Sequence, residues 1–156
     1  MLSPALIAFV NEWRLGHLAS VGPEGPNVSP KGTFQALDSG RLAFAEIRSP
    51  KTRANISEDP RVEVNMVDVF ARKGVRFRGE AAWHGPETAV FAELAPPWTD
   101  IFGPELAAHF KGFVVIVLSS VKPLTTPAYD IGATERQLRR DYLARFTEMQ
   151  RAQLDA

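Results

Sequence analysis

The stretch that decides the fold reads Leu42-Ala-Phe-Ala-Glu-Ile-Arg-Ser-Pro-Lys-Thr-Arg-Ala-Asn55. Residues 41–47 are mostly apolar and follow Asp38-Ser39-Gly40, a typical hairpin turn, so they predict a β-strand. Ser49-Pro50 predicts the start of a helix, because serine caps helices and proline suits their first turn. This helix is expected to end before Asp59-Pro60. The chain is therefore predicted to pass from a strand directly into a helix.

The start of this helix is a candidate anion site. The first N–H groups of a helix have no partner within it, and the helix dipole makes that end positive. Arg48, Lys51 and Arg53 surround it, and Ser49 and Thr52 add hydroxyls. A phosphate ester accepts several charge-assisted hydrogen bonds from such a set. An ordinary solvated helix face has the same composition, so the residues alone leave both interpretations open.

The preceding strand, predicted over 27–36, carries a further cation. Its polar face consists of Asn27, Ser29, Lys31, Thr33 and Gln35. Pairing with 41–47 across the hairpin would bring Lys31 opposite the Ile47 end, near the helix start. Pro30 cannot donate to a strand ladder, so this strand is expected to be an edge strand or to be bulged. The convergence of Lys31 on the helix start favours a phosphate ligand.

The rest of the chain predicts more strands and several helices. Further strands are expected over 17–21, 62–66, 75–83 and 113–121. Helices are expected from Ser3-Pro4 to a stop at Gly16, twice within 86–109, and after a capping box of Thr134 and Gln137. Strands with hairpin turns and peripheral helices indicate a mainly β, antiparallel barrel with α additions. The 156 residues suit a single domain, 1–156.

Composition argues against several classes of function. The chain has 18 basic and 18 acidic residues, a balance that does not favour nucleic-acid binding. It has no cysteine, which excludes disulfides, thiolate nucleophiles and cysteine metal sites. The three histidines are far apart, so no metal site is expected. No apolar run has the length of a membrane helix and the N-terminus lacks a basic signal segment, so we expect a cytoplasmic protein without a membrane partner.

Several motifs, taken in their order along the chain, resemble those of one known family. They are Val28-Ser-Pro-Lys-Gly-Thr33, the strand Leu42 to Ile47, Ser49-Pro-Lys51 with Asn55 and Asp59-Pro60, Gly74-Val-Arg-Phe-Arg-Gly79, and Pro127 to Glu135. Together they resemble the pyridoxamine 5'-phosphate oxidase-like FMN-binding split β-barrels, over most of residues 5–145. The resemblance implies an antiparallel Greek-key split β-barrel. It also implies a homodimer with two flavin sites across its interface.

The resemblance further implies which residues bind FMN. The phosphate is expected at Ser49 and Lys51 of the Ser-x-Lys motif, with Lys31 and Arg48 as helpers. The flavin ring is expected along Phe44–Ile47, largely against backbone groups. The complete candidate cofactor-binding set is Lys31, Phe44, Ala45, Glu46, Ile47, Arg48, Ser49, Lys51 and Thr52.

One departure from the family limits these expectations. True pyridoxamine-phosphate oxidases carry a C-terminal Trp/Arg-rich segment, whereas Leu138–Phe146 here predicts a helix, so vitamin B6 oxidation is not implied. Asn65 or Val67 is expected near the ring or the dimer interface. We expect an FMN-dependent oxidoreductase of an unknown small-molecule redox substrate, without an assigned catalytic residue. The alternatives are a non-catalytic flavin or haem carrier and a deazaflavin-dependent reductase on the same barrel.

Overall fold

The structure, a computed structural model, describes residues 2–155. They divide into two compact units. The first contains the chain up to Met66 together with Arg76–Val121, and the second contains Val67–Val75 and the chain from Lys122 onward. The candidate site residues all belong to the first unit.

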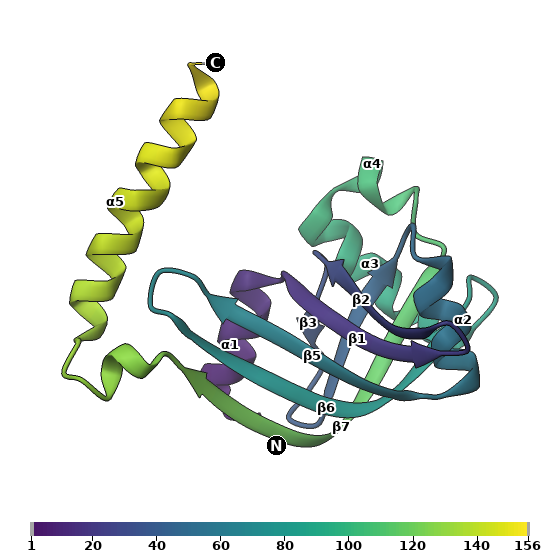
Figure 1. Cartoon of the computed structure of the whole chain (residues 1–156). Coiled ribbons are helices and arrows are strands. Elements are labelled where there is room, and N and C mark those ends of the chain that lie inside the picture. Colours follow the sequence, from purple (N-terminus) through teal and green to yellow (C-terminus); the bar gives the residue numbers. More distant parts are fainter. Residues whose placement is uncertain (1, 156) are drawn as a thin grey trace. The chain divides into compact units, whose positions relative to one another are not determined.

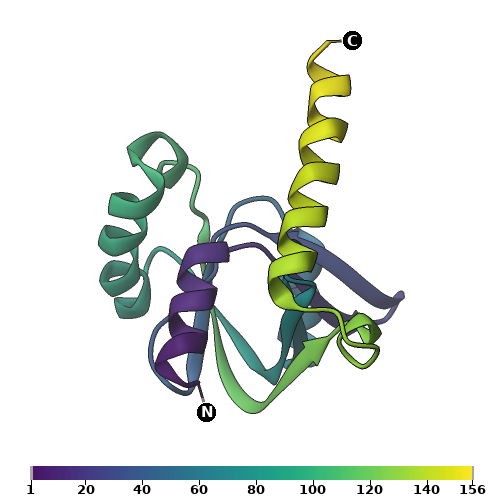
Figure 2. The ribbon, with the colours of Figure 1, turned by 90° about the vertical axis from the view of Figure 1, so that its left-hand side faces the viewer.

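The centre of the fold is a seven-stranded sheet (Figure 1). Its strands are β1 (Gly16–Gly22), β2 (Gly25–Lys31), β3 (Gln35–Ala36), β4 (Arg41–Glu46), β5 (Arg61–Asp68), β6 (Lys73–His84) and β7 (Gly112–Thr125), in the order β2-β1-β5-β6-β7-β4-β3. The helices are α1 (Pro4–Trp13), α2 (Pro50–Glu58), α3 (Ala89–Phe102), α4 (Pro104–Ala107) and α5 (Glu135–Leu154). Within the first unit, α1 and α3 flank the sheet (Figure 2).

The connection between the two edge strands shows why this sheet curls. β2 and β3 are the opposite edges of the sheet, yet only residues 32–34 separate them in the chain. Four residue steps span about 14 Å at most, so the two edges must come close together. The edges do not pair with one another, and the sheet remains open at this point. The protein is therefore a split β-barrel of mainly antiparallel strands with peripheral helices, as predicted.

The predicted strand 27–36 is wrong in one respect, because it forms two strands. Lys31 pairs with Gly16 of β1, and only Gln35 and Ala36 pair with β4. Between these two strands the chain leaves the sheet, because the Phe34 N–H donates to the Arg14 carbonyl at 3.1 Å instead of to a neighbouring strand. The predicted register of Lys31 opposite Ile47 is therefore wrong. The predicted polar face points inward, since Lys31 is buried while the neighbouring apolar Val28 is 65% exposed.

Two helix boundaries test the capping predictions. Ser3 caps α1 as predicted, by accepting from the Leu6 N–H at 3.3 Å. The helix does not stop at Gly16, because Arg14 adopts the left-handed C-cap conformation at φ 56°. Gly16 instead lies in β1, where a Cβ atom would lie 2.8 Å from the ring of Phe34. This glycine makes room for the core rather than ending the helix.

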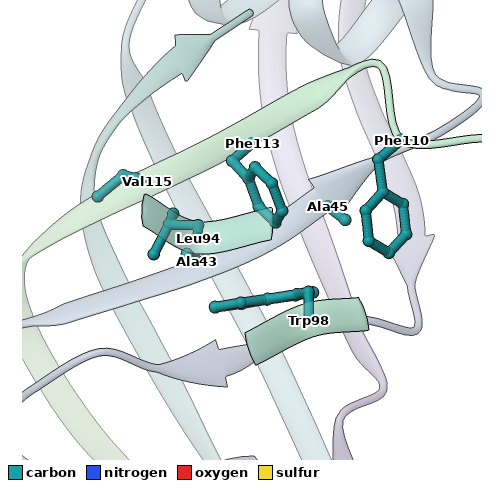
Figure 3. Packing of buried hydrophobic residues seen from close by; sticks show 7 residues of the cluster. All are labelled: Ala43, Ala45, Leu94, Trp98, Phe110, Phe113 and Val115. Carbon is teal, nitrogen blue, oxygen red and sulfur yellow. The ribbon is translucent and has the colours of Figure 1, made fainter. Parts of the chain in front are cut away.

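An apolar cluster attaches α3 to β4 and β7 (Figure 3). Its buried members are Ala43, Ala45, Leu94, Trp98, Phe110, Phe113 and Val115. The rings of Trp98 and Phe113 meet edge to face, with centroids 5.2 Å apart. The Trp98 Nε1–H donates to the Thr33 carbonyl at 2.9 Å. This buried tryptophan therefore anchors the connection between β2 and β3.

The second unit is built around α5. Thr134 and Gln137 form the predicted capping box at its start. Phe146 meets Phe70 edge to face at 5.8 Å, and Arg139 pairs with Asp68 at 2.6 Å. Along α5, Leu138, Tyr142 and Phe146 are half-buried and Met149 is exposed. Within residues 2–155, no helix combines the length and the apolar character needed to cross a bilayer.

Candidate functional site

A cavity of about 420 Å³ lies where the two edges of the barrel approach each other. The end of β2 and the connection to β3 form one wall, and the end of β4 and the start of α2 form another. Its lining residues are Ser29, Pro30, Lys31, Gly32, Thr33, Ala45, Ile47, Arg48, Ser49 and Leu106. The strand-to-helix junction that the sequence singles out therefore lines a real hollow.

Lys31 is the buried cation of this cavity. Its Nζ donates to Ser29 Oγ at 2.7 Å and to Thr52 Oγ1 at 3.4 Å, and lies 5.6 Å from the ring centre of Phe44. Burial lowers the pKa of Lys31 to about 8, and the negative charge of Glu46 acts against this shift. Within the described part of the chain, no carboxylate forms an ion pair with it. A buried ammonium that no carboxylate contacts directly is well suited to an anionic ligand.

Thr33 fixes the floor of the cavity. Its Oγ1 donates to the Ala45 carbonyl at 3.1 Å and accepts from the Ala45 N–H at 3.0 Å. These bonds hold the β2–β3 connection beside β4, where Trp98 also binds it. The predicted cofactor-binding set omits Thr33 and Ser29. Their place on the predicted polar face of strand 27–36 is the signal that could have identified them.

The start of α2 differs from the expected cap. Ser49 occupies the N-cap position, but its side chain makes no capping bond. Instead the Ser49 N–H and its Oγ–H both donate to Glu46 Oε1, the hydroxyl at 3.0 Å. Glu46 is 3% exposed. The carboxylate of Glu46 therefore already accepts from two donors, the N–H and the hydroxyl of Ser49, that were expected to face a ligand.

The structure brings most of the predicted set together. Lys31, Ala45, Ile47, Arg48 and Ser49 line the cavity. Thr52 contacts the Lys31 ammonium, the Phe44 ring lies near it, and Glu46 binds Ser49.

Lys51 lies apart from this group. Its Nζ donates to Glu24 Oε2 at 2.7 Å, and the pair is largely exposed. Arg53, also expected around the helix start, lies over the ring of Trp83 at 5.1 Å. Neither side chain lines the cavity. Their partners, Glu24 and Trp83, are distant in sequence, so no local pattern could have indicated them.

A polar network holds α2 against β1 and β2. The Asn55 amide donates to Ser20 Oγ at 3.1 Å, and the Asn27 amide donates to Ser20 at 3.5 Å and to Thr52 Oγ1 at 3.4 Å. A Cβ atom on Gly22 would collide with the Asn55 amide. The network fixes the helix start relative to Lys31.

Asn65 and Val67 are the other residues expected near the ring or the dimer interface. Asn65 pairs opposite the exposed His17 in the sheet, and neither lines the cavity. Val67 is 38% exposed. Among residues 2–155, no group of three or more histidine or acidic side chains is arranged to hold a metal ion.

A second hollow, of about 790 Å³, lies on the sheet away from the first cavity and shares no lining residue with it. It is lined by parts of β1, β5, β6 and β7. Val21 and Val117 are 53% and 58% exposed there. Arg78 forms an ion pair with Glu63 at its rim. This face therefore combines exposed apolar side chains with charges that are already paired.

Comparisons with known proteins agree with this architecture. HupZ of Group A Streptococcus is 25% identical over 81% of this chain and 96% of that chain, with a TM-score of 0.69. An FMN-binding protein from Syntrophomonas wolfei is 16% identical over 77% of this chain and 84% of that chain, with a TM-score of 0.61. An F420 reductase is 21% identical over 70% of this chain and 90% of that chain, with a TM-score of 0.53.

No curated protein matches the sequence. The sequence model of pyridoxamine 5'-phosphate oxidase matches residues 2–126, which include the whole barrel up to the end of β7 and every residue of the cavity. The chain therefore belongs to the pyridoxamine 5'-phosphate oxidase family.

Proposed function

We propose that this protein binds FMN, with the phosphate in the 420 Å³ cavity, and acts as an oxidoreductase on a small-molecule substrate in the cytoplasm. The observation that carries this proposal is Lys31, a buried ammonium that lines the cavity and that no carboxylate of the described residues contacts directly. Hydroxyls of Ser29, Thr33 and Ser49 line the same hollow, and Arg48 adds an exposed cation. A phosphate ester accepts charge-assisted hydrogen bonds from the two cations and a further bond from the Ser29 hydroxyl, whereas the Thr33 and Ser49 hydroxyls already donate to the Ala45 carbonyl and to Glu46.

The chain's own residues fit this role as holders of the cofactor. Lys31 and Arg48 neutralise the phosphate, and the Ser29 hydroxyl, already bonded to Lys31, fixes the ammonium. Ala45 and Ile47 present β4 to the part of the ligand beyond the phosphate. Bound FMN supplies the transfer of electrons or hydride, and the protein supplies position and electrostatics. The proposal assigns no side chain as acid or base.

Absorption spectra and flavin titrations test this function. We expect the purified protein to show flavin absorption, or to acquire it on addition of FMN, and to bind riboflavin far more weakly because riboflavin lacks the phosphate. Equal affinities for FMN and riboflavin would contradict the phosphate site. A Soret band would favour a haem carrier, and binding of a deazaflavin in preference to FMN would favour the reductase named for one structural neighbour.

We also infer a homodimer whose interface includes the exposed sheet face around Val21 and Val117. Exposed apolar side chains rimmed by charges are typical of subunit contacts. The paired Arg78 and Glu63 place both signs of charge on one patch, as a two-fold contact between identical faces requires.

A further inference from the structure

Glu46 is a buried acidic residue that does not itself line the cavity but binds Ser49, which does, and the proposed phosphate site leaves it unexplained. It lies on β4 between Ala45 and Ile47, which both line the cavity. Its carbonyl accepts from the Lys111 N–H at 2.9 Å, and its residue pairs with Gly112 of β7, so its backbone is fixed. Its carboxylate accepts both the N–H and the hydroxyl of Ser49.

This carboxylate competes with a ligand for the same donor. A serine hydroxyl has a single proton to donate. While Ser49 donates it to Glu46, Ser49 cannot donate it to a phosphate oxygen. A phosphate that received this hydroxyl would lie about 5 Å from the carboxylate, at the distance of two successive hydrogen bonds. Ligand and side chain would then repel each other in a partly buried site.

The same charge supports the cation beside it. The Glu46 carboxylate favours the charged form of Lys31, which burial disfavours. Of the charged groups around the cavity, Lys31 and Arg48 attract an anion and Glu46 opposes it. The charges of Lys31, Arg48 and Glu46 therefore sum to about one positive charge, although two cations are present.

We propose that Glu46 is a specificity-determining residue, whose carboxylate keeps Ser49 occupied in the unliganded protein and limits how tightly a doubly charged phosphate binds. This inference rests on the proposed phosphate site. Glu46 thereby makes the cofactor exchangeable, since part of the attraction of the cations is cancelled before the ligand arrives.

Replacement of the carboxylate by its neutral isostere tests the proposal. In Glu46→Gln the amide oxygen still accepts from Ser49, but the negative charge is gone. At pH 6.5, where Lys31 is protonated, we expect Glu46→Gln to bind FMN about tenfold more tightly than the wild-type protein, by fluorescence titration. Its affinity for riboflavin should stay the same, because riboflavin brings no phosphate.

Three further variants separate charge from packing. Glu46→Asp keeps the charge, so it should not tighten FMN binding. Glu12→Gln, an exposed change of the same type on α1, should leave both affinities unchanged. If Glu46→Gln does not fold, as judged by its thermal transition, Glu46→Ala removes the same charge and is expected to show the same gain.

The outcomes distinguish this inference from the function on which it rests. Tighter binding of FMN with unchanged binding of riboflavin supports the role of Glu46. If the wild-type protein binds FMN and the neutral variant binds it equally or less tightly, the role of Glu46 is overturned and the phosphate site stands. If neither protein binds FMN, both proposals are overturned.

Discussion

Lys31 supplies the buried positive charge of the cavity, and Lys51 offers a matched control on the same side of the barrel. Lys31→Met should weaken FMN binding by roughly 1.5–3 kcal/mol, because a charge-assisted bond to phosphate is lost. Lys51→Met should change it little, because Lys51 pairs with Glu24 outside the cavity lining. Isothermal titration of both variants measures this difference. A larger loss in Lys51→Met would favour the motif-based assignment of the phosphate to Lys51.

Lys31 should also set the pH dependence of FMN binding. Burial lowers the pKa of Lys31 to about 8, so its ammonium is charged at pH 7 and mostly neutral at pH 9 in the free protein. Phosphate binding needs the charged form, so FMN affinity should be constant up to about pH 7.5 and should fall as the pH rises through 8.

A conservative variant isolates this titration. Lys31→Arg stays charged throughout the range, so its FMN affinity should be flat between pH 7 and 9. Fluorescence titrations at half-unit steps measure both curves. A flat curve for the wild-type protein would remove Lys31 as the titrating group.

At the scale of the elements, β6 and β7 approach each other closely at Gly79. A Cβ atom there would overlap the Val117 carbonyl and lie 3.0 Å from Ile116. Gly79→Ala should therefore lower the free energy of unfolding by roughly 1–3 kcal/mol, the usual cost of overpacking. Urea unfolding at a fixed protein concentration measures this loss.

Gly32 is the matched control for that substitution. A Cβ atom on Gly32 meets nothing within 4 Å. Gly32→Ala should accordingly change the stability by less than about 0.5 kcal/mol. Equal losses of stability at the two glycines would show that the contact with Val117 is not the cause.

Elements set by local signals could be predicted from sequence. β4 and α2 follow from the turn at Asp38–Gly40, from Ser49-Pro50 and from Asp59-Pro60, because turns and helix starts depend on neighbours in the chain. The break at residues 32–34 could not, because Trp98 and Arg14 hold that segment from elsewhere in the sequence.

The candidate site shows the same difference between local features, which sequence can predict, and long-range contacts, which it cannot. Ala45, Ile47, Arg48 and Ser49 could be singled out because a strand-to-helix junction is a local feature, and all four line the cavity. Lys31 lines the same cavity although its predicted register was wrong, since the curling of the sheet, rather than the hairpin, brings it close to Ser49. The Glu46–Ser49 contact depends on side-chain conformations that no sequence pattern fixes.

At the scale of the whole molecule, the proposed dimer can be tested by a charge on the exposed sheet face. Val117→Glu places a carboxylate among the exposed valines of the 790 Å³ hollow, and the two-fold contact would bring two such charges together. We expect sedimentation to show a dimer for the wild-type protein and a shift to monomer for this variant. Val28→Glu, at a valine of similar exposure outside the hollow, should remain dimeric. A wild-type monomer at micromolar concentration would overturn the dimer.

Residues 32–34 act as a short tether between the first and last margins of the sheet. Chain length at this place limits how far the two margins can separate, and the bonds of Thr33 to Ala45 and Trp98 hold the connection within that limit. Inserting a few glycines into this connection would leave the apolar interior intact but would allow the two sheet edges to move apart. The protein would then stay folded but bind an anion more weakly. Stability and ligand binding would thus be separated by an insertion that removes no side chain.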